Sequence, residues 1–164
     1  MLPLPLAAPV TPGQPNTANA VAVIVSIARA VKLVTDGAAR AVVTNPIEKS
    51  VLKAVGFPHP GHTEFLAELV GPGAQAVMML VCPELRVVPV KIHVSLAEAA
   101  RSLTGDDILR CARITAEALI RDFGIDEPRL AVTGLNPHAG EKGAMGWEEI
   151  DIIAPALAQL RDEG

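Results

Sequence analysis

The spacing of apolar positions along the chain predicts helices separated by short apolar runs and by turns rich in glycine and proline. After a proline-punctuated N-terminal segment, apolar residues recur every three or four positions from Val21 to Val34. This spacing predicts an amphipathic helix. Asn16 or Thr17 can cap the helix, and Gly37 can end it. The chain therefore opens with an extended segment and one long helix.

A short strand and two helices are predicted next. Residues 41–44 form an apolar run of strand length, and Asn45 and Pro46 then supply a cap and a first-turn proline for a helix that ends at Gly56. Residues 63–69 form a further helical pattern. A strand, a polar turn and a helix in this order are typical of α/β proteins.

Two further apolar runs predict a β-hairpin. Residues 76–81 and 85–90 read as strands, and only Cys82-Pro-Glu84 separates them. So short a connection favours antiparallel pairing, and together with the strand–helix pattern it predicts a mixed sheet. Pro89 places the second strand near an edge or an end of that sheet.

The second half of the chain predicts more helices. Ser95 begins a short helix with a capping box, and Thr104 begins a longer helix that ends at Gly124. A closing helix begins at Trp147, and Pro155 should kink or interrupt it.

A buried strand followed by a polar turn stands between these helices. Residues 129–133 contain the short apolar run Leu-Ala-Val and read as a strand. The turn Gly134-Leu-Asn-Pro-His-Ala-Gly-Glu141 follows, and its glycines and proline can continue neither a strand nor a helix. Asn136 and His138 are thereby placed at the end of a strand, where ligands bind in α/β proteins. The alternative is a plain turn with a surface histidine.

Composition limits the class of protein. The chain has 164 residues, so we expect residues 1–164 to form a single α/β unit. Its net charge is −4 and it has no basic run, which argues against a nucleic-acid partner. Cys82 and Cys111 stand alone, as in a reducing compartment, and no uninterrupted apolar run has the length of a membrane span. A cytoplasmic protein with no membrane partner is expected.

The candidate chemistry is spread along the chain. The histidines follow no metal motif of fixed spacing, so a metal site would have to combine distant segments. Taken alone, each of the four is better explained as a structural residue: His59, His62, His93 and His138. The helix start at Gly61 could hold an anion, and Lys49 could meet a phosphate. The alternatives are a plain cap and a solvated lysine.

Several segments in a fixed order carry a resemblance to a known family. The series resembles the 4-hydroxythreonine-4-phosphate dehydrogenase family of vitamin B6 (pyridoxine, pyridoxal phosphate) biosynthesis, from one end of the chain to the other. The segments are Thr44-Asn-Pro-Ile-Glu-Lys-Ser50, Pro60-Gly-His-Thr-Glu-Phe-Leu66, Lys91-Ile-His-Val-Ser-Leu96, Gly134-Leu-Asn-Pro-His-Ala-Gly-Glu141 and Gly146-Trp-Glu-Glu-Ile-Asp151.

The resemblance implies a fold and an activity. The family is similar in fold to isocitrate and isopropylmalate dehydrogenases, with two α/β domains and a homodimer that completes the active site. This chain would be its central portion, a mixed sheet flanked by helices. The implied oxidoreductase reaction is oxidation of 4-phosphooxy-L-threonine by NAD, followed by decarboxylation to 3-amino-2-oxopropyl phosphate. A divalent metal (Zn, Mg or Co) would polarise the alcohol.

The resemblance also implies site residues. His62 and Thr63 would bind the small phosphorylated substrate, and His93 and His138 would be two of three metal ligands. His59 matches no functional position. The family's third histidine, in a His-Asp-Gln-Gly segment, and its phosphate-binding residues align outside this sequence. Because a catalytic metal normally has three protein ligands, the fragment alone is expected to lack turnover.

Three alternatives remain open. Relatives with similar motifs oxidise phosphorylated four-carbon sugar acids or dihydrodiol carboxylates. A non-catalytic dimerisation or binding module is a second alternative, and a zinc hydrolase built on the same histidines is a third.

Overall fold

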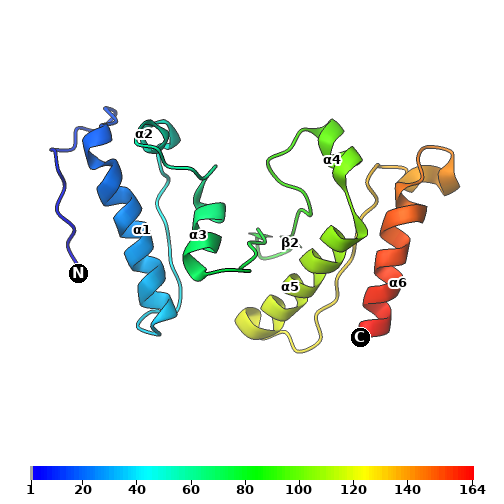
Figure 1. The fold of residues 1–164 in the computed structure, drawn as a ribbon. Helices are drawn as coiled ribbons and strands as arrows, with labels where there is room; N and C mark the ends of the chain where they lie inside the picture. Colours follow the sequence, from blue (N-terminus) through cyan, green and yellow to red (C-terminus); the bar gives the residue numbers. More distant parts are fainter. Residues whose placement is uncertain (1) are drawn as a thin grey trace. The chain divides into compact units, whose positions relative to one another are not determined.

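The computed structural model describes residues 2–164, which form helices, extended segments and one small sheet (Figure 1). The chain divides into two compact units, Met1–Ala76 and Val77–Gly164. The sequence predicts one unit, whereas the structure has a separate hydrophobic core in each of these two.

Three helices and a 3₁₀ turn make up the first unit. The turn η1 (Thr17–Asn19) leads into α1 (Ala20–Thr35), and α2 (Lys49–Ala54) and α3 (His62–Val70) follow. The side chain of Asn16 accepts the N–H of Ala18 at 2.9 Å and so caps η1, whereas α1 itself begins without a side-chain cap. Helices α1 and α3 pack together around a core whose buried members are Ala20, Ile27, Leu52, Phe57 and Phe65.

The first helix has two faces. Its buried residues, Ala20, Ile27 and Val31, recur at helical spacing, as the sequence predicts. By length and composition alone, Thr17–Thr35 could cross a membrane, with a mean hydropathy of 1.6. Because Ala20 and Ile27 belong to the first core, the apolar character of this helix has a structural use within the unit.

His59 is part of the same core region. Its ring lies 5.0 Å from that of Phe57 and 5.1 Å from that of Phe65, and its Nε2 is 3.3 Å from Oε2 of Glu68. These contacts give His59 a packing role, consistent with its having no functional counterpart in the family.

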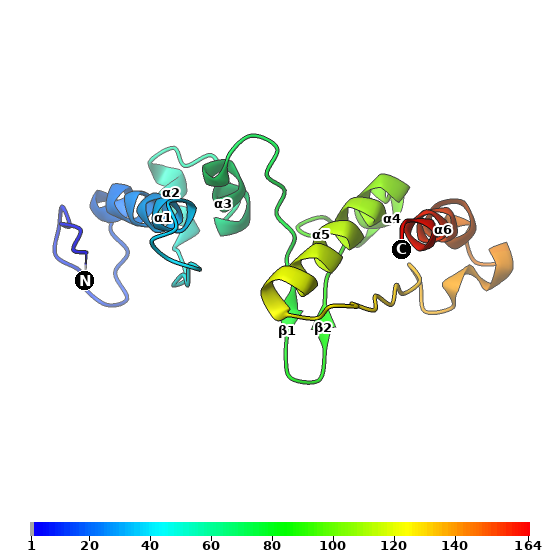
Figure 2. The same cartoon turned by 90° about the horizontal axis from the view of Figure 1, so that it is seen from below.

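The second unit contains the sheet, which is a two-stranded hairpin (Figure 2). Strands β1 (Leu80–Val81) and β2 (Arg86–Val87) pair antiparallel, with Leu80 opposite Val87. The predicted hairpin is confirmed, although both strands are shorter than expected. Within residues 2–164 no larger mixed sheet forms.

The strands predicted at residues 41–44 and 129–133 are wrong. Both segments lie outside helices and strands, and the side chain of Val43 is 97% exposed. A strand needs a hydrogen-bonded neighbour, and the described part of the chain offers these segments none.

Helices α4 (Leu96–Ser102), α5 (Gly105–Phe123) and α6 (Ala154–Glu163) form the rest of the second unit. As predicted, Ser95 caps α4, Thr104 caps α5, and Gly124 ends α5 in the left-handed conformation, with φ of 66°. The 3₁₀ segment η2 (Ala139–Gly143) and the π-helical turn η3 (Glu149–Ile153) precede α6. Helices α5 and α6 enclose the second core, whose buried members are Leu103, Ile108, Leu109, Ile153 and Ala156.

Helices α2 and α6 differ in how well the sequence predicts their starts. Helix α2 begins at Lys49, where Glu48 accepts the N–H of Ser50 at 3.2 Å, so the predicted cap at Asn45 and Pro46 is wrong. The carboxylate of Glu48 reaches the free amides two residues on, which places the cap three residues later. The predicted interruption near Pro155 is confirmed, since the π-helical turn stands immediately before α6.

Candidate functional site

His62 and Thr63 occupy the first turn of α3. Gly61 precedes them in an extended conformation and provides no side-chain cap, so the amides of this turn are available to a ligand. His62 also lines a cavity of about 360 Å³ together with Thr44 and Asn45. The Nε2 atom of His62 is buried and has no hydrogen-bond partner among the described residues. A ligand polar group in this cavity would satisfy it.

Lys49 lies close to the same helix start. A Cβ atom built on Gly61 would lie 3.6 Å from Nζ of Lys49 and 3.8 Å from Oε2 of Glu64. The two anion-binding candidates that the sequence offers separately, Gly61 and Lys49, therefore meet at one place. The carboxylate of Glu64 partly offsets the positive charge there.

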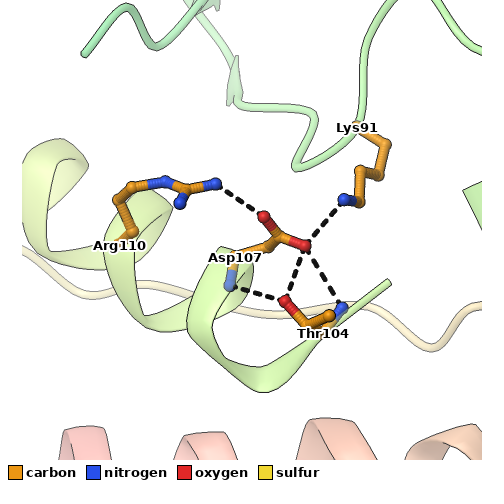
Figure 3. A network of polar contacts seen from close by, with 4 residues as sticks. All are labelled: Lys91, Thr104, Asp107 and Arg110. Atoms are coloured by element: carbon orange, nitrogen blue, oxygen red, sulfur yellow. Dashed lines mark hydrogen bonds and ion pairs between the residues drawn. The ribbon is translucent and has the colours of Figure 1, made fainter. Parts of the chain in front are cut away.

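His93 is exposed and stands in the left-handed region, with φ of 59°. The segment that leads to it is held by Lys91, whose Nζ lies 2.7 Å from Oδ2 of Asp107 (Figure 3). Left-handed backbone is uncommon for a residue with a side chain, and it marks a constrained position. The ion pair anchors the chain two residues before His93.

Asp107 is the centre of a network at the start of α5. The hydroxyl of Thr104 donates to it at 2.7 Å, the N–H of Thr104 at 3.2 Å and Arg110 at 2.6 Å, as Figure 3 shows. Burial acts to raise the pKa of Asp107, but the hydrogen bonds from Lys91, Thr104 and Arg110 and the charge of Lys91 outweigh it and lower the pKa to about 2. The carboxylate stays ionised at neutral pH and keeps Lys91 in place.

His138 stands on the turn that the sequence singles out. Asn136 contacts the backbone of His138 and not its ring: Asn136 Oδ1 accepts the backbone N–H of His138, at 2.8 Å. The ring instead meets Glu141, with 3.1 Å between Nδ1 and Oε1. The side chain of His138 is 60% exposed, so its other nitrogen is accessible from solvent.

Glu149 supports the same turn. Its Oε1 accepts the N–H of Leu135 at 2.9 Å and that of Asn136 at 3.5 Å. Its Oε2 is buried without a hydrogen-bond partner in the described chain.

The imidazole nitrogens that this chain supplies are suitable ligands for a divalent metal. A ligating histidine commonly presents one nitrogen to the metal and gives its other N–H to a carboxylate, and His138 and Glu141 have this arrangement. His93 is the second candidate histidine ligand. Within residues 2–164 no three His, Cys, Asp or Glu side chains gather as a metal-binding group. The chain thus offers candidate ligands rather than a complete site.

Sequence reasoning missed the carboxylates around these histidines. Glu141 follows His138 at a spacing of three residues, which could have indicated the contact. The capping sequence from Thr104 to Asp107 could have indicated a helix start, but not the link to Lys91. Glu149 is 14 residues from Leu135, and no local spacing could have shown that contact.

Comparison with known proteins identifies the class. The structure has the α/β character of a group of solved dehydrogenases. The model of the family described as pyridoxal phosphate biosynthetic protein PdxA matches residues 2–164. The chain belongs to this family, as its resemblance predicts.

Individual relatives agree. A 4-hydroxythreonine-4-phosphate dehydrogenase of Methylorubrum extorquens is 54% identical over 170 aligned residues, covering 100% of this chain and 49% of that protein. One from Bradyrhizobium diazoefficiens is 58% identical over 156 residues, covering 93% of this chain and 45% of that protein. The crystal structure of a 4-hydroxythreonine-4-phosphate dehydrogenase from Klebsiella pneumoniae gives a TM-score of 0.86 at 36% identity, covering 94% of this chain and 47% of that one. The chain spans about half the length of the curated relatives it matches.

Proposed function

We propose that this chain carries the substrate-binding and part of the metal-binding segments of a 4-hydroxythreonine-4-phosphate dehydrogenase of vitamin B6 biosynthesis. The observation that carries the proposal is the 54% identity to such a dehydrogenase along the whole chain. The proposal includes the isocitrate dehydrogenase-like fold, a cytoplasmic location, no membrane partner and a homodimer that completes the site.

The proposed reaction is an oxidation followed by loss of carbon dioxide. The secondary alcohol of 4-phosphooxy-L-threonine gives a hydride to NAD⁺ and a proton to solvent or a base. The resulting ketone loses CO₂ and takes up a proton, which leaves 3-amino-2-oxopropyl phosphate. A bound divalent metal (Zn, Mg or Co) would polarise the alcohol and the ketone.

The residues of this chain have defined parts in that reaction. His62 offers a buried, unpartnered nitrogen at the cavity, and Thr63 offers a hydroxyl in the first turn of α3, so both can hold polar groups of the substrate. His93 and His138 would ligate the metal, with Glu141 orienting the ring of His138. We propose that residues outside this sequence supply the third ligand and the phosphate contacts, and that residues 1–164 alone have no turnover.

A complementation experiment tests the function. This chain is co-expressed with the segments of the Methylorubrum dehydrogenase that lie before and after the aligned region, and NADH formation is followed with 4-phosphooxy-L-threonine and NAD⁺. We expect background rates from this chain alone and from the added segments alone, and turnover from the complex that His62→Ala removes. Light scattering establishes that the complex forms. A well-formed complex without activity would contradict the proposal and favour a non-catalytic dimerisation module.

The same complex separates the substrate alternatives. Phosphorylated four-carbon sugar acids and dihydrodiol carboxylates are oxidised by related enzymes, and this chain includes only part of the substrate site. Faster NADH formation with one of these compounds would transfer the proposal to that substrate.

The metal ligands have their own test. If His93 and His138 share a metal, His93→Ala and His138→Ala should each weaken Zn²⁺ binding by the complex to a similar degree, and the double variant should be little worse than either. Calorimetric titration measures the three affinities, and His59→Ala is the matched control because His59 packs against Phe57 and Phe65. Two independent, additive losses would argue against a shared site.

A further inference from the structure

Glu149 connects the start of the closing helix to the turn that bears His138. It is the first residue of η3, and its Oε1 accepts the N–H groups of Leu135 and Asn136 at 2.9 and 3.5 Å. A single carboxylate oxygen therefore holds two consecutive backbone amides at the entry to the turn.

Asn136 carries this restraint across the turn. Its Oδ1 accepts the N–H of His138 at 2.8 Å, and its Nδ2 donates to the carbonyl of Met145 at 3.2 Å. Asn136, whose amide donates to Glu149, therefore also fixes the backbone of His138 and the carbonyl of Met145 on the far side of the turn.

Gly140 allows the carboxylate to approach closely. Gly140 has φ of 71°, and a Cβ atom built there would lie 2.7 Å from Oε2 of Glu149 and 2.9 Å from the carbonyl of Gly146. No side chain fits between the turn and the carboxylate. The turn also has left-handed backbone at Glu141 and Lys142, with φ of 43° and 59°, which persists only where the surroundings impose it.

We infer that Glu149 is a positioning residue for His138. It acts through the amides of Leu135 and Asn136 and does not touch the imidazole. By fixing the turn it keeps the ring of His138 beside Glu141, with the other nitrogen directed to a ligand. The assignment of a metal to that nitrogen rests on the proposed function, whereas the restraint on the backbone does not.

Two substitutions separate positioning from bulk packing. Glu149→Gln keeps an acceptor oxygen for the two amides, and Glu149→Met fills similar space without one. In the Met variant we expect the amide of His138 to exchange with deuterium roughly ten times faster, because its hydrogen-bonded support is lost. The Gln variant should stay near the wild-type rate. Glu163→Met, which removes a carboxylate from α6, should leave this amide unchanged.

A Zn²⁺ titration of the reconstituted complex, followed through the ring resonances of His138, is the second readout. We expect Glu149→Met to weaken the response about tenfold, and Glu149→Gln to weaken it little. If the wild-type ring does not respond to Zn²⁺, the metal assignment of the proposed function is wrong, and the exchange measurement still decides the positioning.

Wild-type exchange at His138 in a folded Glu149→Met variant would overturn the inference. If that variant does not fold, Glu149→Ala takes its place, since it also removes the acceptor oxygen and leaves the backbone of the turn unsubstituted. Faster exchange at His138 in Glu149→Ala supports the inference, and unchanged exchange overturns it.

Discussion

Asp107 and Glu141 show that two carboxylates can contribute very differently to the stability of the fold. The carboxylate of Asp107 is 14% exposed and meets Lys91, Thr104 and Arg110. Glu141 is 56% exposed and meets only the ring of His138 among the described side chains. A paired, sheltered charge contributes to stability, whereas an exposed pair contributes little. Asp107 therefore serves the fold, and Glu141 serves the orientation of a ring.

The lowered pKa of Asp107 predicts how stability depends on pH. A carboxyl group with a pKa of about 2 in the folded chain, below the usual 3.8, stabilises the fold above pH 4 and loses this effect as the pH falls toward 2. Asp107→Asn should thus cost about 1–2 kcal/mol at pH 6, and the difference from wild type should shrink near pH 2. Urea unfolding at both pH values measures it.

The neighbouring residue Asp106 provides the control for that measurement. It is exposed in the first turn of the same helix, so Asp106→Asn changes the same charge without the network. A pH dependence of stability that is equal in the two variants would contradict the assignment to Asp107.

Helix α5 illustrates stabilisation at the level of an element. Its first turn is closed by the reciprocal contacts of Thr104 and Asp107, and its last turn by Gly124 in the left-handed region. Gly105, at the other end, has ordinary backbone and open space, with its nearest neighbours 3.9 Å from a built Cβ atom. The two glycines of this helix thus have different reasons to be there.

Substituting these glycines should change stability in opposite directions. Gly124→Ala places a Cβ at φ of 66° and should cost about 1 kcal/mol. Gly105→Ala should add about 0.5 kcal/mol, because alanine restricts the unfolded chain and favours the helix. Thermal unfolding measures both signs. Equal destabilisation by the two changes would show that the backbone of Gly124 is not the cause.

Helices were predictable from the sequence because their signals are local. The caps at Asn16, Ser95 and Thr104 and the end at Gly124 depend on residues within one turn. Strands depend on partners elsewhere, so residues 41–44 and 129–133 have the composition of strands but remain unpaired here. The hairpin was predictable because its two strands supply each other's partners.

The candidate site shows the same difference between local and long-range signals. His62, Thr63, His93 and His138 could be named from motifs, and their roles stay predictions. The residues that fix them could not be named, because Lys91 with Asp107, and Glu149 with Leu135, meet only when distant segments fold together. The spacing of residues along the sequence predicts local features of the backbone, such as helix caps and turns. It carries no information on contacts between distant segments.

At the scale of the molecule, residues 2–164 contain two hydrophobic cores, each inside one compact unit. Leu52 is 1% exposed in the first, and Leu109 is 7% exposed in the second. Removing a buried leucine side chain costs about 2–5 kcal/mol, because apolar contacts are lost and a cavity remains. Because the two cores share no residues, each substitution should lower the stability only of the unit that contains it.

Calorimetry of the chain should therefore resolve two unfolding transitions. Leu52→Ala should lower the midpoint of one transition and Leu109→Ala that of the other, and the double variant should show the sum of the two changes, since distant sites act additively. Val43→Ala is the control: its side chain is 97% exposed, and neither midpoint should change. A single transition that both leucine substitutions shift would mean that the two units unfold as one cooperative domain. That result would support the single unit that the length of the chain predicts.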